Sequence, residues 1–370
     1  SKIDGRRIVA RPLQECAVSD ATFAMVCCAC GAEQVVKESV ASQGWRLAFS
    51  RPGFVTLKHD GPAELPHGVF VRTASHSIGS ARGDDADQLI ETMSERLRGE
   101  LGSTLRFDQL HVWPKDRVPI GRFGFEPGLD EVSRAVAEQV FSRIAESWLR
   151  CDAPNRIAES GERVLDLVLV EPSYWFYGWH MASDWPSRWP GGVQPIQPRY
   201  EPISRAYYKA AEAITWSGFE MREGDLAIEI GSAPGGACGR LLELGMTVIG
   251  IDPANMDERI AKHPRFRHLR ARAGDLPRKE FRGAKWLLVD SNVKPDKTLV
   301  TVENIVTHRL SQIQGLLITL KIGDYEHASL IDRWMARIES WGPSRVRVRQ
   351  LARNKVEVCF AITMGNRPAP

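Results

Sequence analysis

The chain has 370 residues, more than one hydrophobic core usually serves, so we expect two or three domains. Its hydrophobic fraction of 43% and charged fraction of 26% are typical of soluble proteins, and a net charge of +3 does not by itself indicate nucleic acid. No apolar run reaches the roughly 20 residues that cross a bilayer, and the amino terminus lacks a secretory apolar core, so we expect a cytoplasmic protein without membrane contact.

Seven cysteines, an odd number scattered among apolar residues, are typical of reduced thiols in a cytosol. Three of them, Cys27, Cys28 and Cys30, form a cluster. A structural zinc ion needs four ligands, and no second cysteine pair or histidine pair follows to complete them. The sequence therefore favours buried helical cysteines over a zinc or redox site.

Residues 1–195 combine strand and helix patterns without regular alternation. The expected strands lie at 45–57, 68–73, 106–113 and 164–170, and the expected helices at 84–101 and 130–149. This order indicates an α+β arrangement. Because this half has neither a glycine-rich cofactor turn nor a cluster of catalytic residues, we expect it to serve recognition.

Residues 172–200 are rich in Trp, Pro and Gly, as in the run Tyr174-Trp175-Phe176-Tyr177-Gly178-Trp179-His180. Such a segment cannot act as a flexible linker, because its aromatic rings must pack somewhere. One interpretation is a plug packed between domains, and the other is a stacking platform for unpaired bases. We favour packing for most of these rings.

A second module begins near Tyr200. The expected strands lie at 226–230, 246–251, 286–289, 315–320, 344–350 and 356–363, and the expected helices at 203–215, 236–244, 296–310 and 326–341. Strands that alternate with helices predict a parallel, doubly wound sheet. The last two strands, joined by a short polar turn, predict an antiparallel hairpin at its edge.

The segment 227–236, Ala-Ile-Glu-Ile-Gly-Ser-Ala-Pro-Gly-Gly, leads an apolar strand directly into a turn of small residues. Glycines let such a turn approach a ligand closely, and an acid about 20 residues later, here Asp252, can bind ribose hydroxyls. The turn matches neither the dinucleotide fingerprint nor the triphosphate loop. It indicates a nucleotide-type cofactor, the alternative being a glycine-rich turn in an unrelated α/β protein.

Four charged residues stand where this sheet would form the mouth of a site. Asp290 and Lys321 each end an apolar strand. Lys209 lies on the helix that opens the module, and Glu357 lies in the last strand. The carboxyl ends of parallel strands meet in one crevice, so we expect these side chains to face a ligand together.

Basic residues crowd the stretch 259–285, where only Asp275 and Glu280 oppose them. They are Arg259, Lys262, Arg265, Arg267, Arg270, Arg272, Arg278, Lys279, Arg282 and Lys285. A basic run beside a cofactor site can neutralise phosphates. A solvated loop and helix face explains the pattern equally well.

The glycine turn and the four charged residues resemble the cofactor loop and the Lys-Asp-Lys-Glu set of the FtsJ-type ribose 2′-O-methyltransferases, over about residues 200–365. More narrowly, the chain is similar to the bacterial family that methylates a cytidine of 23S rRNA, in which a THUMP-containing half precedes this module. The matching stretches are Arg51-Pro52-Gly53-Phe54-Val55, Tyr177-Gly178-Trp179, Pro202-Ile203-Ser204-Arg205, Val289-Asp290, Lys294-Pro295 and Thr319-Leu320-Lys321. The chain departs from the family at Glu229, where Asp is common, and at Ala237, where Trp is usual.

The resemblance implies a Rossmann-like methyltransferase domain at 200–366, a ferredoxin-like subdomain at 1–70 and a THUMP-like RNA-binding domain at 71–195. It implies S-adenosyl-L-methionine as the cofactor, with the turn around its methionine part and Asp252 on its ribose. The implied cofactor residues are Gly231, Ser232, Ala233, Pro234, Gly235, Gly236, Asp252 and Asp275. Asp275 would accept a hydrogen bond from the adenine amino group, and capping a helix is its alternative role.

The chemistry assigns a role to each of the four charged residues. A ribose hydroxyl is a weak nucleophile, so a base must remove its proton, and a lysine can do this only if its pKa falls from about 10.4 toward neutrality. A neighbouring ammonium and partial burial both lower a lysine pKa. We expect Lys321 to be the base and Lys209 its cationic neighbour. Asp290 would position Lys321, and Glu357 would hydrogen-bond a lysine.

The sequence therefore predicts an S-adenosylmethionine-dependent RNA ribose 2′-O-methyltransferase. We expect a monomer that acts on protein-free or precursor 23S rRNA, without DNA or metal. The loop Asp290-Ser291-Asn292-Val293 lacks the Asn/Asp-Pro-Pro-Tyr motif of amino-group methyltransferases. A small-molecule O-methyltransferase stays open, because only the basic run and the extra half point to RNA. A non-catalytic RNA-binding protein is the third alternative, and the complete set of charged residues argues against it.

Overall fold

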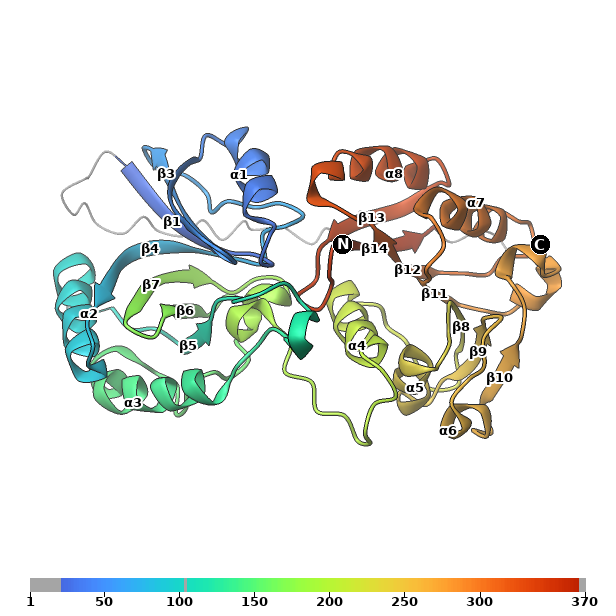
Figure 1. Ribbon diagram of the computed structural model, residues 1–370, viewed down its shortest axis with the longest axis horizontal. Helices are drawn as coiled ribbons and strands as arrows, with labels where there is room; N and C mark the ends of the chain where they lie inside the picture. The colour runs from blue at the N-terminus through green and yellow to red at the C-terminus, as the bar shows by residue number, and fades with distance from the viewer. Residues whose placement is uncertain (1–20, 103–104, 366–370) are drawn as a thin grey trace, which may run out of the picture.

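Two seven-stranded sheets, one in each half of the chain, form the framework of the protein (Figure 1). A computed structural model describes residues 21–102 and 105–365. Residues 1–20, with the amino-terminal stretch that lacks a secretory pattern and Cys16, lie outside the described residues, as does the expected domain end at 366.

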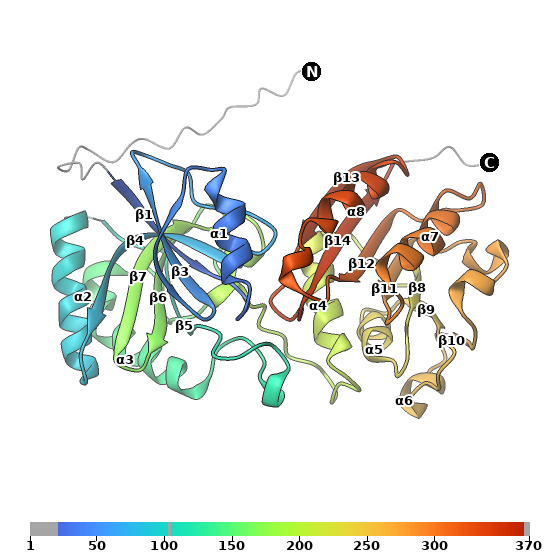
Figure 2. The ribbon, with the colours of Figure 1, turned by 45° about the horizontal axis from the view of Figure 1, so that its top comes forward.

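The amino-terminal sheet is mixed. Its strands are β1 (Ala21–Cys27), β2 (Arg46–Arg51), β3 (Phe54–Asp60), β4 (Thr73–Arg82), β5 (Gln109–Pro114), β6 (Arg163–Glu171) and β7 (Tyr174–Met181), in the order β2-β3-β1-β4-β7-β6-β5. The helices are α1 (Glu33–Ala41), α2 (Ala86–Leu101) and α3 (Glu131–Trp148). Figure 2 shows α2 and α3 beside β4 to β7, and residues such as Met93 and Val140 share a buried cluster with Leu167. One sheet carries strands from both sides of residue 70, and the subdomains 1–70 and 71–195 stay a prediction.

Three elements of this half differ from the sequence-based expectation. The expected strand 45–57 is a hairpin, because Gly53 (φ +76°) turns the chain between β2 and β3. The expected strand 68–73 does not form, and only its last residue, Thr73, belongs to a strand, as the first residue of β4. The cysteines are not helical: Cys27 ends β1 and Cys28 follows it, both buried. β1 lies between β3 and β4, and its residues 24–27 are all buried, so this strand does not alternate apolar and polar residues.

The aromatic segment contributes a strand to the sheet. β7 pairs antiparallel with both β4 and β6. Trp175 and Tyr177 of this strand are buried in the cluster that includes α2 and α3, and Trp189 is buried after it. Packing is thus confirmed for these three rings. Their expected place between the domains is wrong for β7, whose rings pack within the amino-terminal half.

The carboxy-terminal sheet is the doubly wound sheet that the sequence predicts. Its strands are β8 (Leu226–Ile230), β9 (Thr247–Ile251), β10 (Phe266–Leu269), β11 (Trp286–Asp290), β12 (Gly315–Lys321), β13 (Pro343–Arg349) and β14 (Glu357–Met364), in the order β10-β9-β8-β11-β12-β14-β13. β8 to β12 pair in parallel, and β14 pairs antiparallel with β12 and β13, which confirms the hairpin at the edge. The short strand β10 was not expected.

Helices cover both faces of this sheet. They are α4 (Ala206–Ser217), α5 (Gly236–Glu243), α6 (Glu258–Ala261), α7 (Pro295–Val306) and α8 (Leu330–Glu339). Successive residues of β8 point to opposite faces: Ala227 packs with α4 and α5, and Ile228 packs with α7 and α8. Both faces of the parallel strands are therefore buried. Within residues 21–102 and 105–365, no helix is both long and apolar enough to span a bilayer.

The two halves are joined by arginines that donate to main-chain carbonyl groups across their boundary. Arg349 of β13 donates to the carbonyl oxygens of Val71 (2.9 Å) and Arg72 (2.8 Å). Arg353 donates to the carbonyl oxygen of Gln194 (3.0 Å). One apolar cluster also runs from α1 to α7 and α8. The halves therefore pack directly against each other.

A buried ion pair anchors the segment that follows β5, and its loss should destabilise the fold. The Arg72 guanidinium donates to both carboxylate oxygens of Asp116 at 2.7 and 2.6 Å, and the side chains are only 7% and 2% exposed. Asp116→Ala would leave a buried guanidinium without its counter-ion. We expect it to lower the free energy of unfolding by about 3–5 kcal/mol, measured by urea titration with tryptophan fluorescence.

The matched control is the exposed pair of Arg46 and Asp60, whose side chains are 60% and 73% exposed. Asp60→Ala should lower the free energy of unfolding by less than about 1 kcal/mol. Equal losses in the two variants would contradict the role given to the buried pair.

Candidate active site

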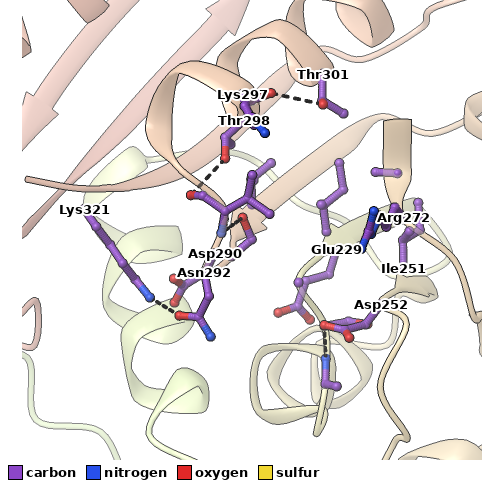
Figure 3. A pocket seen from close by; sticks show the side chains of 18 of the residues that line it. Glu229, Ile251, Asp252, Arg272, Asp290, Asn292, Lys297, Thr298, Thr301 and Lys321 are labelled. Carbon is purple, nitrogen blue, oxygen red and sulfur yellow. Dashed lines mark hydrogen bonds between the residues drawn. The ribbon is translucent and has the colours of Figure 1, made fainter. Parts of the chain in front are cut away.

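A pocket of about 890 Å³ opens at the carboxyl ends of β8, β9, β11 and β12 (Figure 3). This volume lies within the range of sites for cofactor-sized molecules. The strand order reverses between β8 and β11, and in open α/β sheets ligands bind at such a reversal. The pocket therefore lies at the edge of the sheet that the sequence analysis predicts.

The turn between β8 and α5 requires glycine at two positions. Gly231 has φ +83°, and a Cβ there would lie 2.3 Å from the carbonyl oxygen of Asp290. Gly235 has φ +121°, and a Cβ there would lie 2.8 Å from the Ile260 side chain. Any other residue would be strained, and its Cβ would press against β11 at position 231 and against α6 at position 235.

Only part of this turn faces the pocket. The expected cofactor residues that line the pocket are Gly231, Ser232, Ala233, Asp252 and Asp275. Pro234, Gly235 and Gly236 are not among the lining residues. A Cβ at Gly236 would lie 2.2 Å from Ser204 Oγ, so this glycine packs against the segment before α4. These three residues shape the turn from behind.

Of the two expected acids, Asp252 lies on the wall of the pocket and Asp275 lies at its edge. Asp252, after β9, accepts hydrogen bonds from two main-chain amides at 3.2 and 2.8 Å, which hold its carboxylate in place. Asp275 ends the short 3-10 helix Ala273–Asp275 and is exposed. Its alternative role as a helix cap is wrong, because the following helical turn begins after Pro277.

Three of the four charged residues meet at the Lys209 ammonium. Lys209 Nζ lies 2.6 Å from Asp290 Oδ2 and 2.7 Å from Glu357 Oε1, which confirms that Glu357 contacts a lysine. Burial alone would lower the pKa of Lys209, but the two carboxylates outweigh it and raise this pKa above its ordinary value. Burial likewise opposes the charge of Glu357, yet Lys209 holds the pKa of Glu357 below its ordinary value. Lys209 is therefore a protonated centre of the site.

Lys321 faces the open pocket beside this cluster. It donates to Asn292 Oδ1 (Figure 3) and lies opposite Glu357 in the β12–β14 pair. Its side chain is exposed, whereas partial burial was expected. The expected contact between Asp290 and Lys321 is also wrong. Asp290 bonds to the buried Lys209 instead, and Asn292 contacts Lys321.

Glu229, near the end of β8, lines the pocket and is only 2% exposed. Its Oε2 atom has no hydrogen-bond partner. Burial raises the pKa of Glu229 to about 8; a hydrogen bond with Cys238 opposes this, and the negative charges of Asp290 and Asp252 add to it. From the sequence, Glu229 stood out only as a departure from the pattern of the resembling family.

Several other pocket residues were not predicted as site residues. They are Arg205, Arg272, Asn292, Lys297, Thr298, Thr301 and Lys355. Lys297 and Thr301 are four residues apart on α7, a helical spacing that could have identified a polar face toward the strand ends. Asn292 follows Asp290 on the same loop. Across the part of the chain that the structure describes, no three potential metal ligands gather in one place.

Five of the ten basic residues in the stretch 259–285 form ion pairs with acids. The ion pairs are Arg259–Asp257, Lys262–Glu258, Arg265–Glu223, Arg267–Glu280 and Lys285–Asp225. Four of these five acids lie outside the stretch, so counting charges within it misses them. Among its basic residues, Arg272 lines the pocket. The interpretation as a solvated face is thus favoured for the paired half of these basic residues.

Curated relatives share part of this sequence. A protein named Ribosomal RNA large subunit methyltransferase M from Laribacter hongkongensis is 28% identical over 232 residues, which is 59% of either chain. A protein of the same name from Aromatoleum aromaticum is 25% identical over 180 residues, 46% of this chain and 48% of that protein. The chain thus spans about half the length of the relatives that it matches. No protein-family model matches the chain.

Similarity to solved structures is weak. The fibrillarin pre-rRNA processing protein of Methanococcus jannaschii has a TM-score of 0.36 at 11% identity, over 56% of this chain and 90% of that protein. A similarity this weak carries no argument about fold or function.

Glu229 should make the protein less stable as the pH rises. Its pKa in the folded protein is about 8, above the ordinary value of 4.5, so the folded chain keeps a proton that the unfolded chain releases. The stability that this group contributes is complete below about pH 4.5 and is lost as the pH rises through about 8. Glu229→Gln is neutral at every pH and similar in shape, so it should abolish this loss.

Urea titrations at about pH 5 and about pH 8.5 measure the effect as the fall in the free energy of unfolding between them. The fall should be smaller in Glu229→Gln than in the wild type. Glu138→Gln, at an exposed glutamate of α3, is the control and should behave as the wild type does. A parallel fall in all three proteins would show that another group is responsible.

Proposed function

We propose that this protein is an S-adenosylmethionine-dependent ribose 2′-O-methyltransferase that acts on RNA, with a cytidine of 23S rRNA as its target. The observation that carries the proposal is the Lys209 ammonium held between Asp290 and Glu357, with Lys321 facing the same pocket. A THUMP-like role of the amino-terminal half in holding RNA belongs to the proposal.

The pocket residues suit the proposed cofactor. The tight turn at Gly231 lets the main chain approach a ligand, and Asp252 offers a carboxylate to ribose hydroxyls. Asp275 at the edge can accept a hydrogen bond from an adenine amino group. The unpartnered Oε2 atom of Glu229 is a buried polar atom that a ligand in this pocket can satisfy.

S-adenosylmethionine, when bound, would supply an electrophilic methyl group, and the electron pair of the broken carbon–sulfur bond would stay on its sulfur. Residues of this chain orient and deprotonate the ribose hydroxyl that receives the methyl group. Lys321, in its neutral form, accepts the hydroxyl proton at Nζ while an electron pair of the oxygen forms the bond to the methyl carbon. A substrate that covers Lys321 removes water from its ammonium, which favours loss of the proton. Lys209 stays protonated between its two carboxylates and orients the hydroxyl.

The names of the relatives support ribosomal RNA as the substrate class. A small-molecule O-methyltransferase is the second candidate, because acids pair with half of the basic residues in the stretch that would otherwise favour RNA. A non-catalytic RNA-binding protein is the weaker alternative, since the ion pairs around Lys209 keep the charged residues assembled in the pocket.

Lys321→Ala should abolish methyl transfer to protein-free 23S rRNA and leave the affinity for S-adenosylmethionine nearly unchanged. The reason is that Lys321 contacts Asn292 on the open side of the pocket and not the glycine turn. Transfer of a tritiated methyl group measures the first effect, and calorimetric titration measures the second. Lys279→Ala, at an exposed lysine outside the pocket, is the control. Turnover near the wild-type rate would rule out Lys321 as the base.

Asp252→Ala should have the opposite effect and weaken binding of S-adenosylmethionine. A charged acceptor for ribose hydroxyls contributes about 1.5–3 kcal/mol, so calorimetry should show a loss of this size. Asp252→Asn keeps one acceptor oxygen and should lose less. NAD and ATP should produce no comparable heat with the wild type. An unchanged affinity in Asp252→Ala would place the ribose elsewhere.

A further inference from the structure

A loop of the amino-terminal half forms part of the pocket rim. We call residues 115–126, which follow β5, the rim loop; Figure 1 shows this part of the chain reaching from β5 toward the other half. A Cβ at Gly121 would lie 2.6 Å from Cε of Lys355 and 3.8 Å from Nη1 of Arg205, and both of these residues line the pocket. Arg205 also donates to both carboxylate oxygens of Glu126, to Oε2 at 3.1 Å. The rim loop therefore touches the mouth of the site.

The rim loop is held in one conformation. Near its start Asp116 forms the buried ion pair with Arg72, and Ile120 is buried. Across its tip, the Gly121 amide donates to the carbonyl oxygen of Phe125 at 2.8 Å. A preorganised loop can bind a ligand without first losing conformational entropy.

Phe123 projects from this loop into solvent, in a conformation that costs free energy. Its side chain is 87% exposed, and φ +52° with ψ +29° places its backbone in the left-handed region, which disfavours residues other than glycine. Neither burial nor backbone preference explains a phenylalanine here. An exposed ring on a fixed loop beside a nucleotide-sized pocket has the form of a platform on which a base can stack.

Two basic side chains lie at this part of the rim. The Arg122 guanidinium carbon lies 5.0 Å from the Phe123 ring centroid, and Lys355 lies beside Gly121. Arg122 and Lys355 are exposed, and neither takes part in any ion pair among the described residues. The rim thus differs from the stretch 259–285, where acids pair with five of the ten basic residues.

We propose that the rim loop binds an unpaired nucleotide of single-stranded RNA next to the one whose ribose enters the pocket. Phe123 stacks on the base, and Arg122 and Lys355 bind the flanking phosphates. This inference rests on the proposed function and extends it, because it names the single-stranded form of RNA as what the rim holds.

Fluorescence anisotropy with a labelled, single-stranded RNA of about 12 nucleotides and mixed sequence tests the site. Phe123→Ala should weaken binding about 5- to 100-fold, the loss expected for one base stack, and Phe123→Trp should retain binding. Arg122→Gln and Lys355→Gln should each weaken binding and reduce the salt slope by about 1. Phe123→Ala should leave that slope unchanged, because it removes no charge.

Phe123→Gly separates binding from folding. Glycine tolerates the left-handed backbone, and the ring that it removes makes little contribution to burial, so the melting temperature should be unchanged or higher. Its RNA affinity should nevertheless fall as in Phe123→Ala. The matched control is Leu47→Ala, at an apolar residue of β2 that is 50% exposed, and it should bind RNA as the wild type does.

The outcomes distinguish this site from the proposed function. Binding by Phe123→Ala within about twofold of the wild type would overturn the site, even if the wild type methylates RNA. If Phe123→Ala loses RNA binding but the wild type transfers no methyl group to RNA, the site stands and the proposed function fails. If the wild type binds no RNA, both fail, and the exposed ring would then be tested as a contact for another protein.

Discussion

One ammonium group, that of Lys209, connects three elements from distant parts of the sequence. It lies on α4 and bonds to Asp290 at the end of β11 and to Glu357 at the start of β14. Displacing either strand end would leave a largely buried charge short of a partner, which costs more free energy than an exposed ion pair contributes. The mouth of the pocket therefore keeps its shape through this charge balance. The same balance keeps Lys209 protonated, so in the proposed reaction Lys321, and not Lys209, accepts the proton.

The direct packing of the two halves decides what surrounds that mouth. The main-chain amide of Gln350 donates to the carbonyl oxygen of Val69. The rings of Tyr325 and Phe70 pack edge to face with centroids 5.6 Å apart. These contacts hold the turn between β13 and β14, which carries Lys355, against the amino-terminal half. The loop that follows β5 can then complete the rim of a pocket built by the other sheet. The rim is thus a joint product of both halves.

The sequence predicts the carboxy-terminal sheet well, because its apolar runs end at turn residues, and the bounds of β8 agree at both ends. β10 was missed because Arg267 and His268 interrupt a strand of four residues. Topology brought the charged strand ends to one edge, as expected. Which of these side chains would contact each other was not predictable, because it depends on how far each side chain extends into the pocket. Lys209, for example, reaches Asp290 from α4. Ion pairing of the basic stretch was missed for a related reason, since most of its acids lie elsewhere in the sequence.

The pocket carries less negative charge at neutral pH than the number of its carboxyl groups suggests. Asp252 has main-chain donors for both oxygens, whereas Glu229 is buried with one oxygen unpartnered. Because burial raises the pKa of Glu229 to about 8, this group is mostly protonated at pH 7. A ligand that brings positive charge close to Glu229 favours its ionised form, so binding releases a proton. By linkage, the affinity for such a ligand rises with pH up to about 8, the pKa of Glu229 in the ligand-free protein.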